Sequence, residues 1–147
     1  MDLGLKDRAA IVTAASRGLG KAAAQALARE GANIALCSRT DQIFATAEEI
    51  QRETGVDVLA IQTDLTEPKQ LETMISKAHN HFQKIDILII NSGGPPPGGF
   101  LDLNPDDWTT AIDLTVMSAV RLCYAVVPHM LEQGHGSIVA TQSYSVK

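Results

Sequence analysis

The chain has 147 residues, about the length of one domain, and a formal net charge of −5. Because it is acidic and has no run of Lys and Arg, we expect it to bind neither nucleic acid nor an anionic membrane surface. Residues 1–8 lack the apolar core of a signal or transit peptide, and apolar runs such as residues 87–90 are too short to cross a bilayer. These features predict a cytoplasmic protein.

The first unit along the chain consists of a strand, a glycine turn and a helix, within residues 9–31. The apolar run 9–12 breaks into a turn with Gly18 and Gly20, and an alanine-rich helix follows. The two glycines allow the backbone to approach a pyrophosphate, and the helix N-terminus offers free N–H groups. This order is typical of a dinucleotide-binding turn. Ala14 stands where a further glycine is usual, so the alternative is a helix that merely begins with two glycines.

Strands and helices then alternate along the rest of the chain. The predicted strands are residues 33–37, 56–61, 85–90 and 136–141, and the predicted helices are residues 42–53, 67–82 and 105–133. Asp41, Thr66 and Asn104 are the predicted N-caps, and Pro105 follows the last of them at the first helical position.

Alternation of this kind requires right-handed crossovers and a parallel sheet. We therefore expect an α/β fold, a doubly wound (Rossmann-like) parallel sheet with strand order 3-2-1-4-5. Its ligand crevice would lie at the carboxyl ends of strands 1 and 4. The turns at 13–20, 38–39, 64–65 and 91–94 all follow strand ends, so they would converge on this crevice.

Side chains that commonly bind metals are scattered. Cys37 and Cys123 lie far apart and form no C-x-x-C pair, which predicts free thiols in a reducing compartment. The histidines show no zinc-ligand spacing with Cys, Asp or Glu, so we expect solvated or structural roles for His79, His81, His129 and His135. No metal site is predicted.

With these motifs in order, the whole chain resembles the short-chain dehydrogenase/reductase family, near its 3-oxoacyl-carrier-protein reductase-like branch. Residues 13–20 resemble the family's TGxxxGxG turn, with Ala14 at the first glycine. Asp64-Leu65 matches the acid–aliphatic pair that brackets the adenine ring. Residues 91–94 stand where the family has NNAG, and residues 136–143 look like the strand that ends at the catalytic serine.

The end of strand 2 indicates the cofactor. An acid there would bind a free ribose 2′-hydroxyl and repel a 2′-phosphate, but the chain has Ser38 and then Arg39, with Arg17 as a second cation. Guanidinium groups suit phosphate through paired, charge-assisted hydrogen bonds, so we expect NADP(H) rather than NAD(H). The alternative is that both arginines are solvated surface charges. The predicted cofactor-binding residues are Thr13, Ser16, Arg17, Gly18, Leu19, Gly20, Ser38, Arg39, Asp64, Leu65, Asn91, Ser92, Gly93 and Gly94.

The resemblance implies catalysis by a tyrosine, a lysine, a serine and an asparagine, of which the chain matches the serine, Ser143. Thr115 occupies the asparagine position. Tyr144 and Lys147 are three residues apart, where the family's pair is four apart and lies on the next helix. We therefore interpret Tyr144 as a loop residue and expect the catalytic Tyr and Lys beyond residue 147. Residues 1–147 would form one dinucleotide-binding domain that lacks the last strands and helices, left by proteolysis of a longer protein.

The resemblance implies that the intact protein is an NADPH-dependent reductase of a carbonyl substrate, a 3-oxoacyl group or a similar ketone, and in reverse an alcohol dehydrogenase. By family analogy it is a homo-oligomer, a tetramer, and this chain alone would be inactive. One alternative is a non-catalytic NADP(H)-binding or regulatory protein, which Thr115 favours. Another is a methyltransferase, which Ser38-Arg39 argues against because that enzyme needs an acid there. Prolines 95–97 would form either a wall of the substrate pocket or a stiff connector.

Overall fold

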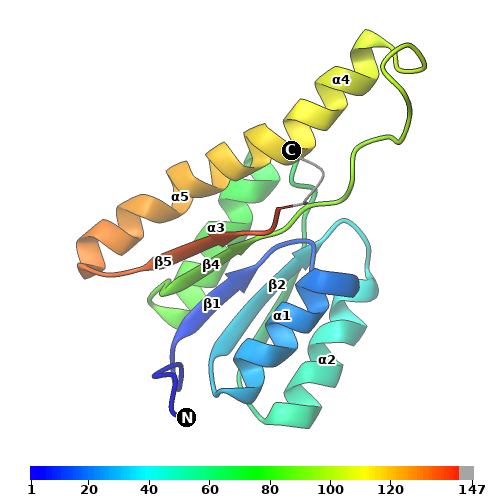
Figure 1. Cartoon of the computed structure of the whole chain (residues 1–147). Helices are drawn as coiled ribbons and strands as arrows, with labels where there is room; N and C mark the ends of the chain where they lie inside the picture. The colour runs from blue at the N-terminus through cyan, green and yellow to red at the C-terminus, as the bar shows by residue number, and fades with distance from the viewer. Residues whose placement is uncertain (143–147) are drawn as a thin grey trace.

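The computed structural model describes residues 1–142 and shows a five-stranded parallel sheet between two layers of helices (Figure 1). The strands are β1 (Ala9–Val12), β2 (Asn33–Ser38), β3 (Val58–Gln62), β4 (Ile87–Ile90) and β5 (Ser137–Ala140). The helices are α1 (Gly18–Arg29), α2 (Gln42–Thr54), α3 (Pro68–Phe82), α4 (Pro105–Ile112) and α5 (Ser118–Gln133). The strand order β3-β2-β1-β4-β5 confirms the predicted doubly wound sheet.

Each face of the sheet has its own apolar core, because successive strand residues point to opposite faces. On one face α1 and α2 cover the sheet, in a cluster that includes Ala10, Val12, Ile34, Leu36, Ala24, Ala28, Ile43 and Ile50. On the other face α3 and α5 do so, in a cluster that includes Ile11, Cys37, Leu88, Leu71, Met74, Leu122 and Val126. Burial on both faces explains why the central strands are almost wholly apolar.

The helix starts agree with the predicted caps in part. Asn104 begins α4 with a capping box, since its side chain accepts from the N–H groups of Asp106 and Asp107. Asp41 stands at the N-cap of α2 but makes no side-chain capping bond. The prediction for Thr66 was wrong: the N-cap of α3 is Glu67. Thr66 instead donates its hydroxyl and N–H to Asp64 Oδ1, at 2.8 and 2.9 Å.

The predicted helix 105–133 is interrupted by a π-helical turn, η1 (Asp113–Met117), which joins α4 to α5. In this turn the N–H of Ser118 donates to Asp113 O, five residues back. The Ser118 hydroxyl donates to Leu114 O, the carbonyl to which the Ser118 N–H would donate in a regular α-helix. α5 lies against the sheet, while α4 extends past it (Figure 1).

The stretch 105–133 also corrects the expectation that every apolar run is too short to cross a bilayer. By length and composition alone this helix could do so, with a mean hydropathy of 1.5 over its most apolar 18 residues. In the fold, Leu122 and Val126 are fully buried against the sheet, but only 22% of the apolar window is buried. Its opposite side leaves large apolar side chains exposed, among them Trp108, Ile112, Val116, Val120 and Tyr124.

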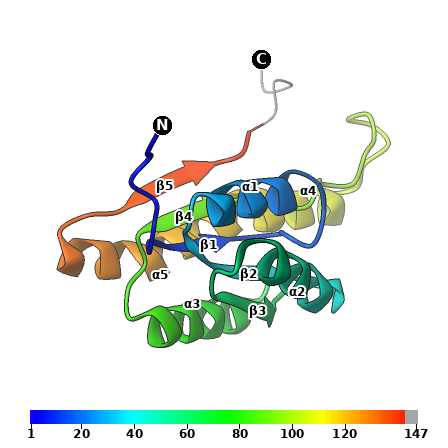
Figure 2. The same ribbon diagram turned by 90° about the horizontal axis from the view of Figure 1, so that it is seen from below.

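β5 forms one edge of the sheet (Figures 1 and 2), and within residues 1–142 all four of its residues are exposed. Its adjacent residues Ile138 and Val139 point to opposite faces and are 39% and 54% exposed. Apolar residues on both faces are typical of a strand that is covered on both sides.

A buried carboxylate, Asp86, holds the amino ends of β1, β4 and β5 together. It accepts hydrogen bonds from Ala9 N at 2.8 Å, from Arg8 Nη1 at 3.0 Å and from His135 Nε2 at 2.8 Å. Burial raises the pKa of Asp86, but these hydrogen bonds and the charge of Lys84 together outweigh burial and hold the pKa below its ordinary value. The Asp86 carbonyl also accepts from Ser137 N, which ties β5 to the same point.

Candidate functional site

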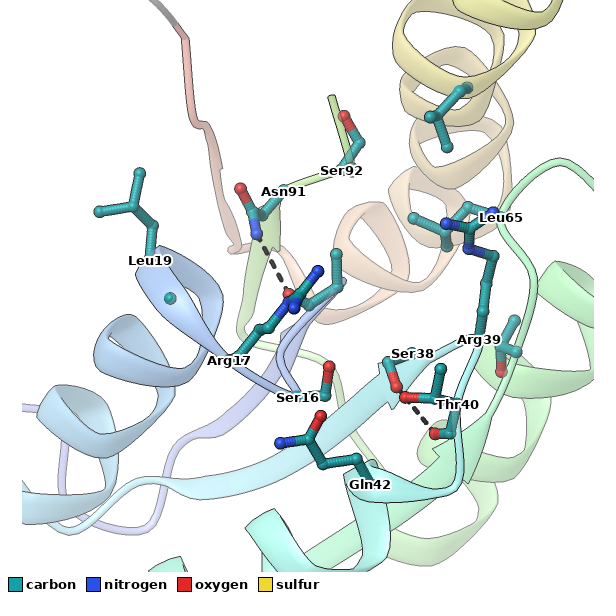
Figure 3. A pocket seen from close by; sticks show the side chains of 15 residues that line it. Ser16, Arg17, Leu19, Ser38, Arg39, Thr40, Gln42, Leu65, Asn91 and Ser92 are labelled. Atoms are coloured by element: carbon teal, nitrogen blue, oxygen red, sulfur yellow. Dashed lines mark hydrogen bonds between the residues drawn. The ribbon is translucent and has the colours of Figure 1, made fainter. Parts of the chain in front are cut away.

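A cleft of about 450 Å³ opens at the carboxyl ends of the strands (Figure 3). The turns after β1, β2, β3 and β4 all contribute to it, as the strand order predicts, and Leu114 of η1 joins them. Its lining consists of Ala14, Ser16, Arg17, Gly18, Leu19, Ser38, Arg39, Thr40, Gln42, Thr63, Leu65, Asn91, Ser92, Gly93 and Leu114.

The turn between β1 and α1 uses its small residues for two different reasons. Ala14 and Gly18 both have positive φ, of 48° and 59°, a conformation that favours glycine. Gly20 is needed for space: a Cβ there would lie 2.5 Å from Ala14 O and 2.9 Å from Asn91 Nδ2. Asn91 Nδ2 donates to Ala14 O at 3.2 Å, so this bond holds the turn against the end of β4.

The N-terminus of α1 at this turn suits an anion. Arg17, its N-cap residue, provides no side-chain capping bond, and the first turn of the helix contains no acid. The first N–H groups of a helix have no partner within the helix, and the helix dipole places positive charge there. A pyrophosphate could accept hydrogen bonds from these groups.

The cleft carries positive charge. Arg17 extends from the glycine turn, and Arg39 runs from the end of β2 toward Leu65 (Figure 3). Among the described residues neither arginine forms an ion pair, and no Asp or Glu lines the cleft. The backbone beside Arg39 is fixed, because Gln62 Nε2 donates to Arg39 O at 2.8 Å and Ser38 Oγ donates to Thr40 O at 2.9 Å.

Some predicted binding residues lie behind the cleft rather than in its lining. Thr13 is buried, donates its hydroxyl to Asn91 O at 2.6 Å and accepts from Asn91 N at 2.9 Å, so it joins β1 to β4. Gly20 lies beneath Ala14, and the Asp64 carboxylate bonds Thr66. Gly94 is exposed and outside the lining. The predicted catalytic residue Ser143 lies outside the described residues.

The prediction missed five lining residues: Ala14, Thr40, Gln42, Thr63 and Leu114. Ala14, Thr40 and Thr63 adjoin predicted residues at strand ends, and Gln42 begins the helix after β2, so the turns of a parallel sheet were a signal for these four. Leu114 comes from a distant helix, and no local pattern marks it. Prolines 95–97 are exposed and lie outside the lining of this cleft, and both interpretations of them remain predictions.

Comparison with known proteins decides the family. The model of the family described as short chain dehydrogenase matches residues 8–147. The chain belongs to the short chain dehydrogenase family. Relatives of this dehydrogenase-family chain include an uncharacterized oxidoreductase of Staphylococcus epidermidis, 30% identical over 96% of the chain and 60% of the relative. The NADP-dependent mannitol dehydrogenase of Hypocrea jecorina is 34% identical over 96% of the chain and 54% of the relative.

A crystal structure of the L-sorbose reductase from Gluconobacter frateurii, complexed with NADPH and L-sorbose, has the same fold. Its TM-score is 0.94 at 32% identity, over 98% of this dehydrogenase-family chain and 55% of the reductase. The chain therefore spans somewhat more than half the length of these relatives.

Among the described residues, no Cys, His, Asp or Glu lines the cleft. Within residues 1–142, no group of three or more His, Cys, Asp or Glu could hold a metal ion. Cys37 and Cys123 are free, as predicted. Burial raises the pKa of the Cys37 thiol to about 12, so this thiol at the end of β2 stays protonated at neutral pH.

Proposed function

We propose that the protein containing this chain is an NADP(H)-dependent reductase of a carbonyl substrate, and in reverse an alcohol dehydrogenase. The observation that carries the proposal is the cleft beside the glycine turn, with Arg17 and Arg39 and no carboxylate in its described lining. Two relatives support the choice of cofactor, since one is an NADP-dependent mannitol dehydrogenase and another a reductase complexed with NADPH.

The described residues fit this cofactor. The N–H groups at the start of α1 would bind the pyrophosphate, and the space that a Cβ on Gly20 would fill lets the turn close on Asn91. Arg17 and Arg39 would bind the 2′-phosphate, and Leu65 would contact the adenine. Asn91, Ser92 and Gly93 would line the nicotinamide ribose. When bound, the cofactor supplies the hydride that reduces the carbonyl.

The catalytic half of the proposal rests on the family. Ser143 would donate a hydrogen bond to the substrate carbonyl, and a Tyr–Lys pair elsewhere in the intact protein would supply the proton. The exposed apolar faces of β5 and the outer side of helix 105–133 are the surfaces that further strands, helices and a second subunit would cover. The chain alone, as one C-terminally incomplete dinucleotide-binding domain, would then be inactive, and the intact protein would be a homo-oligomer, a tetramer by analogy.

Fluorescence titration with NADPH and NADH tests the cofactor proposal. The unsubstituted protein (the parent) should bind NADPH more tightly than NADH. Arg39→Ala and Arg17→Ala should each weaken NADPH binding by roughly 10- to 100-fold, the contribution of a charge-assisted hydrogen bond, and leave NADH binding unchanged. Arg52→Ala is the matched control, because Arg52 is an exposed arginine on α2 outside the cleft lining. Equal affinity of the parent for both cofactors would refute the proposal.

Turnover assays on the intact protein would identify the substrate. The panel consists of a 3-oxoacyl thioester, as the resemblance suggests, and L-sorbose and mannitol, which the relatives' names suggest. Thr115 favours a second candidate, a non-catalytic NADP(H)-binding or regulatory protein. Its hydroxyl donates to Ala111 O at 2.7 Å within the helix, where the family has an asparagine. NADPH binding without turnover of any panel member would support this second candidate.

A further inference from the structure

One side-chain hydrogen bond joins helix α2 to the glycine turn. The hydroxyl of Thr46 on α2 donates to Ser16 O at 3.0 Å, 30 positions earlier in the chain. Other helical threonines bond within their own helix, since Thr54, Thr73 and Thr115 each donate to the carbonyl four residues back. That local bond is common for a threonine inside a helix. The Thr46 hydroxyl therefore departs from the local pattern and serves the glycine turn.

Thr46 is a buried polar residue in an apolar layer. It is 3% exposed and lies on the same face of α2 as Ile43 and Ile50, which are fully buried against the sheet. Moving a hydroxyl out of water is unfavourable unless it forms a hydrogen bond, and Ser16 O is the acceptor that the structure provides. An apolar side chain of the same shape would pack here without that requirement, so packing alone does not explain the threonine.

The bond fixes the peptide unit between Ser16 and Arg17. In a trans peptide the C=O and the N–H point in opposite directions, so a carbonyl turned toward α2 turns the Arg17 N–H away from α2. Arg17 is extended, with φ of −161° and ψ of 176°, and its N–H donates to none of the described residues. Both residues line the cleft. The Thr46 bond therefore sets the place and direction from which Arg17 enters the cleft.

The second cation of the cleft stands at the start of the same helix. Arg39 and Thr40 come just before α2, and Gln42, its first residue, lines the cleft with them (Figure 3). Thr46 lies one turn further along α2, so its bond to the glycine turn connects the segment of Arg39 to that of Arg17. Groups that are held in place before binding lose less entropy when a ligand binds, which favours the ligand that needs both of them.

The rest of the glycine turn has supports of its own. Ala15 N donates to the end of β2 at 3.0 Å, and Ala14 O accepts from Asn91 Nδ2, after β4, at 3.2 Å. These bonds hold the start of the turn against the sheet, so the proposed pyrophosphate site depends little on Thr46. The Thr46 bond acts on the part of the turn that carries Arg17, where the 2′-phosphate is proposed to bind.

We propose that Thr46 is a positioning residue that increases the preference for NADPH over NADH, because it holds the backbone of Arg17 at a fixed place relative to Arg39. The inference rests on the proposed cofactor and goes beyond it, since Thr46 lies outside the cleft lining and acts through Arg17. NADH lacks the 2′-phosphate, so its binding depends less on where the two arginines stand.

Fluorescence titration of the protein containing this chain tests the proposal. Thr46→Val removes the hydroxyl and keeps the shape of the side chain, and circular dichroism checks that the variant is folded. The Kd for NADPH should rise about three- to tenfold, the effect of one hydrogen bond, and the Kd for NADH by less than about twofold. Because the two cofactors differ by the 2′-phosphate, the ratio of their Kd values measures the coupling of Thr46 to that phosphate.

Two further variants separate positioning from a general structural role. Thr46→Ser keeps the hydroxyl and should keep the ratio of the two Kd values within about twofold of the parent's. Thr54→Val is the matched control, because Thr54 is also on α2 and donates its hydroxyl to a carbonyl, Ile50 O, but lies outside the cleft lining. It should leave the ratio unchanged.

The outcomes also distinguish this inference from the proposed cofactor. A parent that binds NADPH and NADH equally refutes both. A parent that prefers NADPH, and loses the preference in Arg39→Ala but not in Thr46→Val, refutes the role of Thr46 alone. An equal loss of both cofactors in Thr46→Val, or a ratio in Thr46→Ser as low as in Thr46→Val, overturns it as well.

Discussion

Replacing Gly20 by alanine should be the most damaging single change in the glycine turn. The new Cβ would lie 2.5 Å from Ala14 O, 2.9 Å from Asn91 Nδ2 and 3.0 Å from Ala15 Cα, and Cβ atoms almost never approach other atoms more closely than 3.0 Å. Two of these neighbours are backbone atoms, and the third is held by its bond to Ala14 O. The turn must therefore move, and the Asn91–Ala14 bond is the contact that breaks.

The size of the loss follows from these contacts. Overpacking of this kind costs about 1–3 kcal/mol, and the lost hydrogen bond adds about 1 kcal/mol, so Gly20→Ala should lower the free energy of unfolding by about 2–4 kcal/mol. For a chain of this length the melting temperature should fall by roughly 5–12 °C. Because the movement displaces the free N–H groups of α1, NADPH binding should weaken as well.

Gly18→Ala is the matched control for Gly20→Ala. Gly18 has a φ of 59°, but a Cβ there would meet no atom of residues 1–142 within 4 Å, so the expected cost is conformational, about 1 kcal/mol. Urea unfolding of both variants, followed by circular dichroism, separates the two effects. If Gly20→Ala costs no more than Gly18→Ala, the close approach of Gly20 to Ala14 and Asn91 does not constrain the turn, and the reasoning fails.

Three further predictions follow from other residues. Ala14→Gly should raise the free energy of unfolding by about 1 kcal/mol, because Ala14 has a φ of 48°; a loss of stability in urea would contradict this. Asp86→Asn should lower the free energy of unfolding by about 1–2 kcal/mol at pH 7, a modest loss because solvent screens its half-exposed cationic partners. Since the pKa of Asp86 is lower in the folded protein, its contribution is present above its unfolded pKa of about 4 and is lost as pH falls through the folded value. The variant should therefore lose less stability in acid than the parent, and a parallel loss would contradict this. Cys37, whose pKa is about 12, should react with a thiol reagent at pH 8 on the order of a thousandfold more slowly in the native protein than in urea, measured by mass spectrometry of the labelled peptide.

The sequence predicted the sheet well, because each strand is a short apolar run between helices of clear periodicity. β1 lies where the pattern placed it, and β2, β3 and β5 differ by no more than two residues at either end. The cap at Thr66 was mispredicted, because the Thr66 hydroxyl donates to the Asp64 carboxylate and does not cap the helix. Both residue types are good helix caps, and capping preferences, which treat each residue separately, do not show that these two side chains pair with each other.

The binding residues were predicted less completely than the strands. The pattern located the turns that meet at the cleft, but it did not distinguish residues that line the cleft from those that hold its walls. Thr13 and Gly20 support the turn from behind, and that role depends on contacts with Asn91, more than 70 positions away. Leu114 lies in η1, where the wide π-helical turn shifts the positions of the apolar side chains around the helix axis. A search for regular helical spacing does not reveal this shift, so Leu114 was not predicted to reach the cleft.

The π-helical turn also determines where this helix can tolerate insertions and deletions. Each residue of an α-helix turns it by about 100°, so removing one residue between 119 and 121 would rotate Leu122 and Val126 away from the sheet. A wide turn holds one residue more than an α-helical turn, so removing one residue within 113–117 would leave a regular helix with both ends in phase. Among homologous proteins, a one-residue gap in this helix should therefore fall at 113–117.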